Sequence, residues 1–230
     1  QEARAAAEFS RHFQITFRDP GLLRLALTHR SYLSVTGMGP HESNERLEFL
    51  GDSVLGLVTS ESLYRRHPGE HEGQLTKTKS LLVSKAILSR RALHIGLGRF
   101  ILMSNSEVES GGRKRPSILA DAFEAVLGAI YLDQGFEAAR RFVEAHLLRG
   151  SQEIVADKRH RNYKSQLQEY VQARPGSMPH YAILRQEGPD HDKTFWVELK
   201  VLNVETMGSG KSKKTAEQDA ARKALALIKP

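Results

Sequence analysis

Apolar residues recur at intervals of three and four positions from Pro20 to about Leu148. This spacing is typical of helices that bury one face and expose the other. The pattern is interrupted at segments that contain glycine and proline, which read TGMGP, HPGEHEG and SGGRKRP. We therefore predict an all-α first domain over residues 1–150.

The last third of the chain has a different pattern. A short helix is predicted from about Tyr163 to Gln172, and the segments HYAILRQ and TFWVELKVLN are rich in the β-branched and aromatic residues that favour strands. A final helix rich in alanine and leucine would bury one stripe, formed by Ala216, Ala220, Ala224 and Leu227. These elements predict a small α+β domain of order α-β-β-β-α over residues 162–230.

A polar segment of mixed charge, SQEIVADKRHRN, lies between these two regions. Segments of this composition typically connect domains, because they carry too few apolar residues to form a core. We predict a linker over residues 151–161. The whole chain thus divides into a helical domain, a linker and a small mixed domain.

The composition limits the partners and the location. The chain carries 34 lysine and arginine residues against 27 acidic residues, a formal net charge of +7. A basic protein favours a polyanionic partner, nucleic acid more than an anionic membrane. The absence of cysteine excludes disulfides and thiolate metal sites. With no apolar run of about 18 residues and no secretory signal pattern in QEARAAAEF, we expect a soluble cytoplasmic protein that does not bind membranes.

Acidic residues form a stripe along one predicted helix, NERLEFLGDSVLGLV. Glu45, Glu48 and Asp52 are spaced by three and four residues, so their carboxylates share one face. The opposite side carries the apolar residues Leu47, Leu50, Val54, Leu57 and Val58. A solvated surface helix has the same pattern, and the spacing alone leaves that alternative open.

Two details indicate that this helix contacts other elements on its acidic side. Phe49 projects beside the carboxylates, where an aromatic side chain needs a partner such as a second subunit. Gly56 lies on the acidic stripe, and the segment SILADAFEAVLGAIYLD repeats the design with Asp121 and Glu124 followed by Gly128. We predict that the two helices cross closely at Gly56 and Gly128 and bring four or five carboxylates together.

A cluster of carboxylates is repulsive unless cations neutralise it. Oxygen ligands without cysteine or a suitably spaced histidine pair select Mg²⁺ or Mn²⁺ over zinc. Two such ions beside a phosphodiester activate the attacking water and stabilise the leaving oxygen. Acid-rich helices on a basic protein therefore suggest a nuclease.

The segment NERLEFLGDSVL is similar to the signature of the ribonuclease III family. ALTHRSY (26–32), EGQLTK (72–77) and SGGRKRPSILADAFEAVLGAIYLD (110–133) follow in the order of that family. The segment LMSNSEVES departs from the family pattern, which puts only local loop contacts in doubt. The resemblance implies an all-α endonuclease domain followed by an α+β double-stranded RNA-binding domain.

The resemblance also implies the site. It gives Asp52, Glu124, Glu45 and Glu72 catalytic roles, and it makes Glu48, Asp52, Asp121 and Glu124 the metal ligands. Only the EGQLTK match singles out Glu72 from other loop acids, so a solvated loop acid remains the alternative there. The family dimerises through its signature helix, which implies a homodimer with Phe49 in the interface.

The closing segment GSGKSKK is not a nucleotide-binding loop, because that pattern requires glycine where this chain has Glu205. Lys213 and Lys214 are predicted to begin the last helix behind a Ser212 cap, against the helix dipole, which suggests a bound phosphate. A solvated basic turn is the alternative.

The tail resembles a double-stranded RNA-binding domain. That resemblance implies minor-groove contacts from Ser165, Gln168, Glu169 and His191, and phosphate contacts from Lys211, Lys213 and Lys214. The aromatic residues of the strands are expected to pack in the core or on the sheet face, and these are Tyr181, Phe195 and Trp196. No nucleotide cofactor is expected.

The resemblance implies a dimeric endoribonuclease that uses Mg²⁺, for which Mn²⁺ can substitute, to cut double-stranded RNA. Its products would be 5′-phosphate and 3′-hydroxyl ends with short 3′ overhangs, and its substrates ribosomal, messenger and transfer RNA precursors. Two alternatives remain. One is a non-catalytic structural RNA-binding protein, and the other is a helical metalloenzyme that acts on a small phosphorylated substrate.

Overall fold

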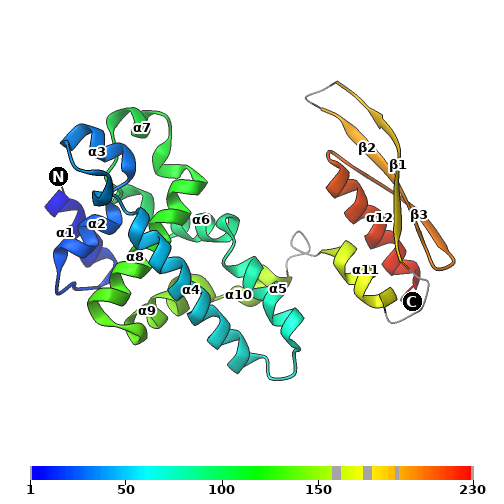
Figure 1. Ribbon diagram of the computed structural model, residues 1–230, viewed down its shortest axis with the longest axis horizontal. Coiled ribbons are helices and arrows are strands. Elements are labelled where there is room, and N and C mark those ends of the chain that lie inside the picture. Colours follow the sequence, from blue (N-terminus) through cyan, green and yellow to red (C-terminus); the bar gives the residue numbers. More distant parts are fainter. Residues whose placement is uncertain (1, 157–161, 173–177, 190–191, 229–230) are drawn as a thin grey trace. The chain divides into compact units, whose positions relative to one another are not determined.

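The computed structural model describes residues 2–156, 162–172, 178–189 and 192–228 (Figure 1). It divides into two compact units, Gln1–Asp157 and Lys158–Pro230. Ser151–Ala156, inside the range predicted as a linker, forms helix α10. The domain limits given by the sequence stay predictions.

The first unit is helical, as predicted. Its α-helices are α1 (Glu2–Phe13), α2 (Pro20–Leu27), α3 (Arg30–Thr36), α4 (Glu45–Arg66), α5 (Glu72–Leu82), α6 (Lys85–His94), α7 (Asn105–Glu109), α8 (Pro116–Gln134), α9 (Phe136–Val143) and α10. Short 3-10 turns occupy Pro40–Glu42, Leu97–Arg99 and Gly112–Lys114, and a π-helical turn occupies Glu144–Leu148. A short parallel bridge pairs Thr28 with Leu102.

Helix α8 is the central helix of this unit, with α2, α4, α6 and α9 packed around it (Figure 1). Pro116 begins the helix, where its missing N–H has no helical partner to lose. Gly135 follows its last residue with φ of 82°, a conformation that favours glycine. Buried side chains such as Leu55, Phe123 and Leu127 form the core between α8 and its neighbours.

Helices α4 and α8 touch through their backbones. A Cβ atom at Gly51 would lie 1.8 Å from the carbonyl oxygen of Glu124, and one at Gly128 would lie 2.4 Å from the carbonyl oxygen of Leu47. Neither position has room for a side chain. The two helices therefore approach as closely as their main chains allow.

The predicted crossing at Gly56 is wrong, although the prediction of Gly128 is correct. At about 100° per residue Gly51 lies on the buried side of α4, whereas Gly56 lies nearly opposite Leu47 and meets only the end of the Lys79 side chain at 3.6 Å. The prediction that Leu57 lies on the buried side is also wrong, because its side chain is 59% exposed at the edge of that face.

The second unit has the predicted order α-β-β-β-α. Helix α11 (Tyr163–Gln172) is followed by β1 (His180–Glu187), β2 (Thr194–Val201), β3 (Val204–Gly210) and α12 (Lys213–Ile228). The strands form an antiparallel sheet in the order β1-β2-β3, and both helices pack on one face of it (Figure 1). Leu167, Val171, Leu199 and Val201 form the core with the alanines of α12.

The buried stripe of α12 differs from the prediction at one residue. Ala216, Ala220 and Ala224 are buried, but Leu227 is 63% exposed and Leu225 is buried instead. Helix α12 packs against both the sheet and α11, so its buried face is turned towards Ala221 and Leu225 and leaves Leu227 at the edge.

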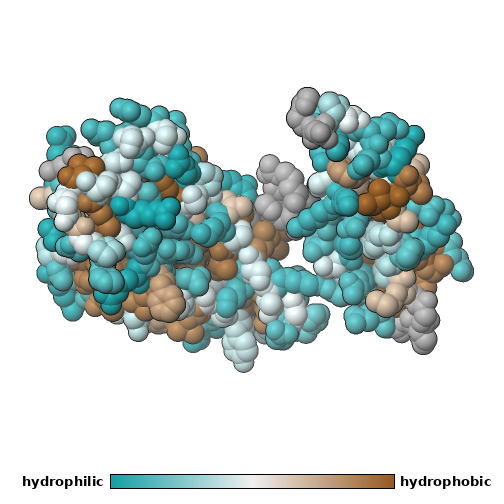
Figure 2. All heavy atoms as spheres, turned by 45° about the horizontal axis from the view of Figure 1, so that its top comes forward, coloured by the Kyte–Doolittle hydropathy of each residue, from teal (hydrophilic) through white to brown (hydrophobic). Residues whose placement is uncertain are grey.

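Hydrophilic side chains cover most of the face of each unit that Figure 2 shows, and hydrophobic side chains reach the surface in separate patches. Within the described ranges, the structure contains no helix with both the length and the apolar composition needed to cross a bilayer.

Candidate active site

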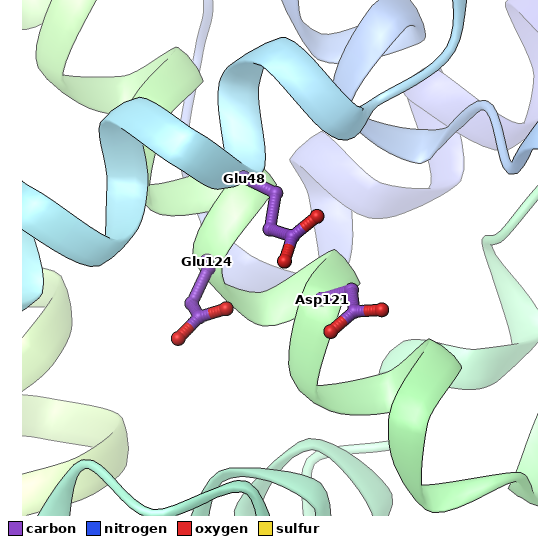
Figure 3. Close-up of side chains that lie close together, drawn as sticks. All are labelled: Glu48, Asp121 and Glu124. Carbon is purple, nitrogen blue, oxygen red and sulfur yellow. The ribbon is translucent and has the colours of Figure 1, made fainter.

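Three carboxylates point towards one another where α4 and α8 cross (Figure 3). Glu48 comes from α4, and Asp121 and Glu124 come from successive turns of α8. One oxygen of each lies within 4.8 Å of the other two. Because Glu48 is one turn from Gly51 and Glu124 is one turn from Gly128, the close backbone contact brings these acids together.

The environment of the cluster opposes full ionisation. Glu124 is only 6% exposed, and burial followed by the charges of Asp52, Glu48 and Asp121 raises its pKa to about 7. Burial, followed by the charge of Asp121, also raises the pKa of Glu48. Buried acids of like charge favour a cation that neutralises them, and an all-oxygen set of three carboxylates fits a hard divalent cation such as Mg²⁺.

A lysine that the sequence pattern did not predict as a site residue lies beside the cluster. Lys85, the first residue of α6, places its Nζ atom 3.0 Å from Oδ1 of Asp121. The hydrogen bond to Asp121 is the main reason that the pKa of Lys85 is raised. The available signal was a lysine directly after Ser84, which caps the helix by accepting from the N–H of Ile87.

Two other predicted acids lie on the same helix as Glu48 but outside the three-carboxylate group. Asp52 is exposed, and its charge contributes to the raised pKa values of Glu48 and Glu124. Glu45 is exposed and accepts a hydrogen bond from Oγ of Ser43 at 3.2 Å. Both acids extend the negative stripe of α4 towards solvent.

Glu72 was predicted to lie in a loop. It is instead the first residue of α5. Its carboxylate accepts a hydrogen bond from Oγ1 of Thr76 on the same helix at 2.8 Å. The structure does not bring it into the group formed by Glu48, Asp121 and Glu124. Its predicted catalytic role stays a prediction.

Phe49 follows Glu48 on α4 and is 79% exposed, as its position in the acidic stripe predicted. It borders an apolar hollow of about 600 Å³, whose other lining residues are Leu22, Leu25, Glu45, Arg46, Leu47, Leu50 and Leu132. An exposed aromatic ring beside an apolar hollow is typical of a surface that another molecule covers.

The second unit exposes its lysines at the start of α12. Lys211, Lys213 and Lys214 are all exposed. Oγ of Ser212 accepts a hydrogen bond from the N–H of Thr215 at 3.2 Å, so the predicted cap is confirmed. Lys211 also forms an ion pair with Asp192, with 2.7 Å between Nζ and Oδ1.

The predicted groove contacts lie mainly on α11. Gln168 and Glu169 are exposed, and Ser165 is half-buried in the first turn, where its N–H donates to Oδ1 of Asn162 at 3.1 Å. His191 lies outside the described residues. On the strands, the guanidinium of Arg185 stacks over the Trp196 ring at 4.4 Å, which agrees with packing on the sheet face.

Comparisons with known proteins agree with both units. A family model described as Ribonuclease-III-like matches residues 19–151, and the double-stranded RNA binding motif matches residues 163–228. Ribonuclease 3 of Pelotomaculum thermopropionicum is 48% identical over 212 residues, which cover 92% of this chain and 88% of that protein. Ribonuclease 3 of Bacillus cereus is 43% identical over 226 residues, which cover 96% of this chain and 90% of that protein.

Solved structures resemble the first unit. The nuclease domain of ribonuclease III from Campylobacter jejuni is 40% identical with a TM-score of 0.56, and the match covers 63% of this chain and 94% of that one. A second structure of that domain, 41% identical with a TM-score of 0.54 over 60% of this chain and 96% of that one, concerns flexibility in a region involved in dimer formation. The chain therefore belongs to the ribonuclease III family, as a ribonuclease whose nuclease domain is followed by a double-stranded RNA-binding domain.

Proposed function

We propose that this ribonuclease hydrolyses phosphodiester bonds within double-stranded RNA with Mg²⁺ held by Glu48, Asp121 and Glu124. The observation that carries the proposal is the group of three carboxylates within 4.8 Å of one another, set between helices of a nuclease domain. Mn²⁺ can substitute, because it accepts the same oxygen ligands. The products are 5′-phosphate and 3′-hydroxyl ends.

A divalent cation held at this site would supply Lewis-acid chemistry, which lowers the pKa of a bound water and offsets negative charge on the phosphate. Glu48, Asp121 and Glu124 would hold it, and the backbone contact between α4 and α8 restrains the relative positions of the two helices that carry them. Asp52 faces solvent next to the group, and we assign it to the metal and catalytic set because its charge already acts on Glu48 and Glu124.

Glu45 and Glu72 complete the proposed catalytic set. Glu45 is included for its position on α4, and Glu72 for its sequence motif. Glu45 is exposed one turn before Glu48 and extends the acidic stripe of α4. Glu72 is assigned on the EGQLTK match alone, since its carboxylate bonds to Thr76 of its own helix.

The second unit holds the duplex in this proposal. Gln168 and Glu169 lie exposed on α11 and Ser165 lies half-buried there, and these residues would contact the minor groove. Lys211, Lys213 and Lys214 would contact phosphates near the N-terminus of α12, where the free helix N–H groups also attract anions. Recognition of this kind depends on the A-form shape and the 2′-hydroxyls, so a DNA duplex is a poor substrate.

We infer a homodimer through the α4 surface. Phe49 is highly exposed beside an apolar hollow, so a two-fold axis would let each Phe49 enter the hollow of the other subunit. The Campylobacter jejuni nuclease domain, for which a region involved in dimer formation is described, supports a dimer, and the choice of surface rests on Phe49 and the hollow. Two sites in one dimer would each cut one strand and leave short 3′ overhangs, in precursors of ribosomal, messenger and transfer RNA.

The test uses the purified full chain with a long end-labelled RNA duplex, in Mg²⁺ or in EDTA. Single-stranded RNA of the same sequence and a DNA duplex are the matched controls. The expected result is shortening of the RNA duplex in Mg²⁺ only, with both controls intact. Tight binding of the duplex without cutting would contradict the proposal and leave a structural RNA-binding protein.

A further inference from the structure

Lys85 is placed to act on the whole carboxylate group. Its Nζ atom bonds directly to Asp121 at 3.0 Å, and its positive charge lowers the pKa values of Glu48 and Glu124 against the effects that raise them. The three acids would carry a formal charge of −3 if all were ionised, and the positive charge of Lys85 offsets one unit of it. The metal-free cluster is thus partly neutralised by the protein itself.

The position of Lys85 on its own helix is unfavourable. It is the first residue of α6, where the unpaired N–H groups carry partial positive charge, and the first turn of α6 contains no acidic residue. The favourable partner is supplied by α8, against which α6 packs. The favourable interactions of Lys85 therefore come from the carboxylate cluster and not from its own helix α6.

The ion pair is accessible to solvent. The Lys85 side chain is 66% exposed, whereas that of Asp121 is 31% exposed. The ammonium group can therefore move into solvent while Asp121 stays in place. A divalent cation held by all three carboxylates needs an oxygen of Asp121, so it competes with the ammonium group for the same carboxylate.

We propose that Lys85 is a resident counter-ion of the cluster, which holds Asp121 while no divalent cation is bound and gives way when one binds. The proposal rests on the proposed function, because it concerns the same cation site. Lys85 stabilises the metal-free cluster and at the same time weakens the binding of the divalent cation.

The test is direct titration of the RNA-free full chain with MgCl₂ by calorimetry, and with MnCl₂ by electron paramagnetic resonance. Lys85→Gln keeps a long polar side chain and removes the charge, and it should bind the cation about three- to tenfold more tightly. Lys114→Gln, at another exposed lysine of the same unit, removes the same charge and should leave the affinity little changed.

A second readout separates a counter-ion from a merely structural residue. The Lys85→Gln variant should unfold more readily than the native chain in EDTA, and saturating Mg²⁺ should remove the difference. A stability loss that persists in Mg²⁺ would overturn the proposal, and so would unchanged or weaker cation binding.

Glu124→Gln separates failure of the counter-ion role of Lys85 from failure of the cation site. If this variant loses cation binding while Lys85→Gln binds as the native chain does, the counter-ion proposal fails and the cation site stands. If Glu124→Gln binds the cation as tightly as the native chain, the proposed cation site itself is wrong.

Discussion

The three acids at the crossing of α4 and α8 are buried or half-buried, whereas the three lysines at the start of α12 are all exposed. The acids lie on two helices whose backbones are in contact, whereas Lys213 and Lys214 lie on the first turn of α12 and Lys211 just before it, all exposed to solvent. Chemistry at the first region therefore depends on where each atom lies, but attraction at the second depends mainly on how many charges are present. Single small changes should stop the first and only weaken the second.

The largest effect is expected from Glu124→Gln. The amide keeps the shape of the side chain but is a poor ligand for a cation, so the single-turnover cutting rate should fall about a thousandfold or more, while the affinity for the RNA duplex stays nearly constant. Glu109→Gln, which neutralises an exposed acid of α7, is the control and should cut normally. Near-normal cutting by Glu124→Gln in Mg²⁺ would show that a single change at the acids does not stop the reaction, which contradicts the expected difference between the two regions.

Gly51→Ala should destabilise the first unit by about 3 kcal/mol, because its Cβ would collide with the backbone oxygen of Glu124 and force the helices apart. Gly56→Ala on the same helix is the control, with 3.6 Å to the nearest atom, and should be neutral or stabilising by up to about 1 kcal/mol. Chemical denaturation followed by circular dichroism suits this test, since the only tryptophan, Trp196, lies in the second unit. Equal stabilities would contradict the backbone contact.

The pH dependence of the free energy of unfolding should reveal that ionisation of the buried acid Glu124 is unfavourable. The pKa of Glu124 is about 7 in the folded chain against an ordinary value of 4.5, so the folded state binds more protons between these values. Its contribution is fully present below about pH 4.5 and is lost as the pH rises through 7, at most about 3 kcal/mol. Unfolding of the native chain and of Glu124→Gln in EDTA should therefore differ in slope over this range, and parallel curves would disprove the assignment.

The smallest effect is expected in the exposed region. Replacing Lys213 and Lys214 by alanine should weaken binding of the RNA duplex about tenfold and reduce the slope of log affinity against log salt by about two, because fewer counter-ions are released. Cutting at saturating protein should remain close to normal, since the acids are untouched. A salt slope equal to that of the native chain would show that these lysines do not contact phosphates.

The sequence predicted those features that depend on neighbours along the chain. Four such features are confirmed: the helix from Tyr163 to Gln172, the element order α-β-β-β-α, the Ser212 cap, and the shared face of Asp121 and Glu124. The spacing did not reveal which flank of α4 meets α8, so Gly56 was chosen over Gly51 and Leu57 was placed in the core. Lys85 was missed because its partner is 36 residues away in sequence.

The contact between Gly51 and Gly128 also bears on the motions of the protein. Since main chain rests on main chain, a small slide or roll of α4 over α8 would make the two backbones collide, so the contact restrains the backbone positions from which the carboxylates extend. Amide hydrogens in the middle turns of both helices should then exchange with deuterium only when the whole unit opens. Their exchange rate would report how stable the contact beneath the site is, without any RNA or metal being present.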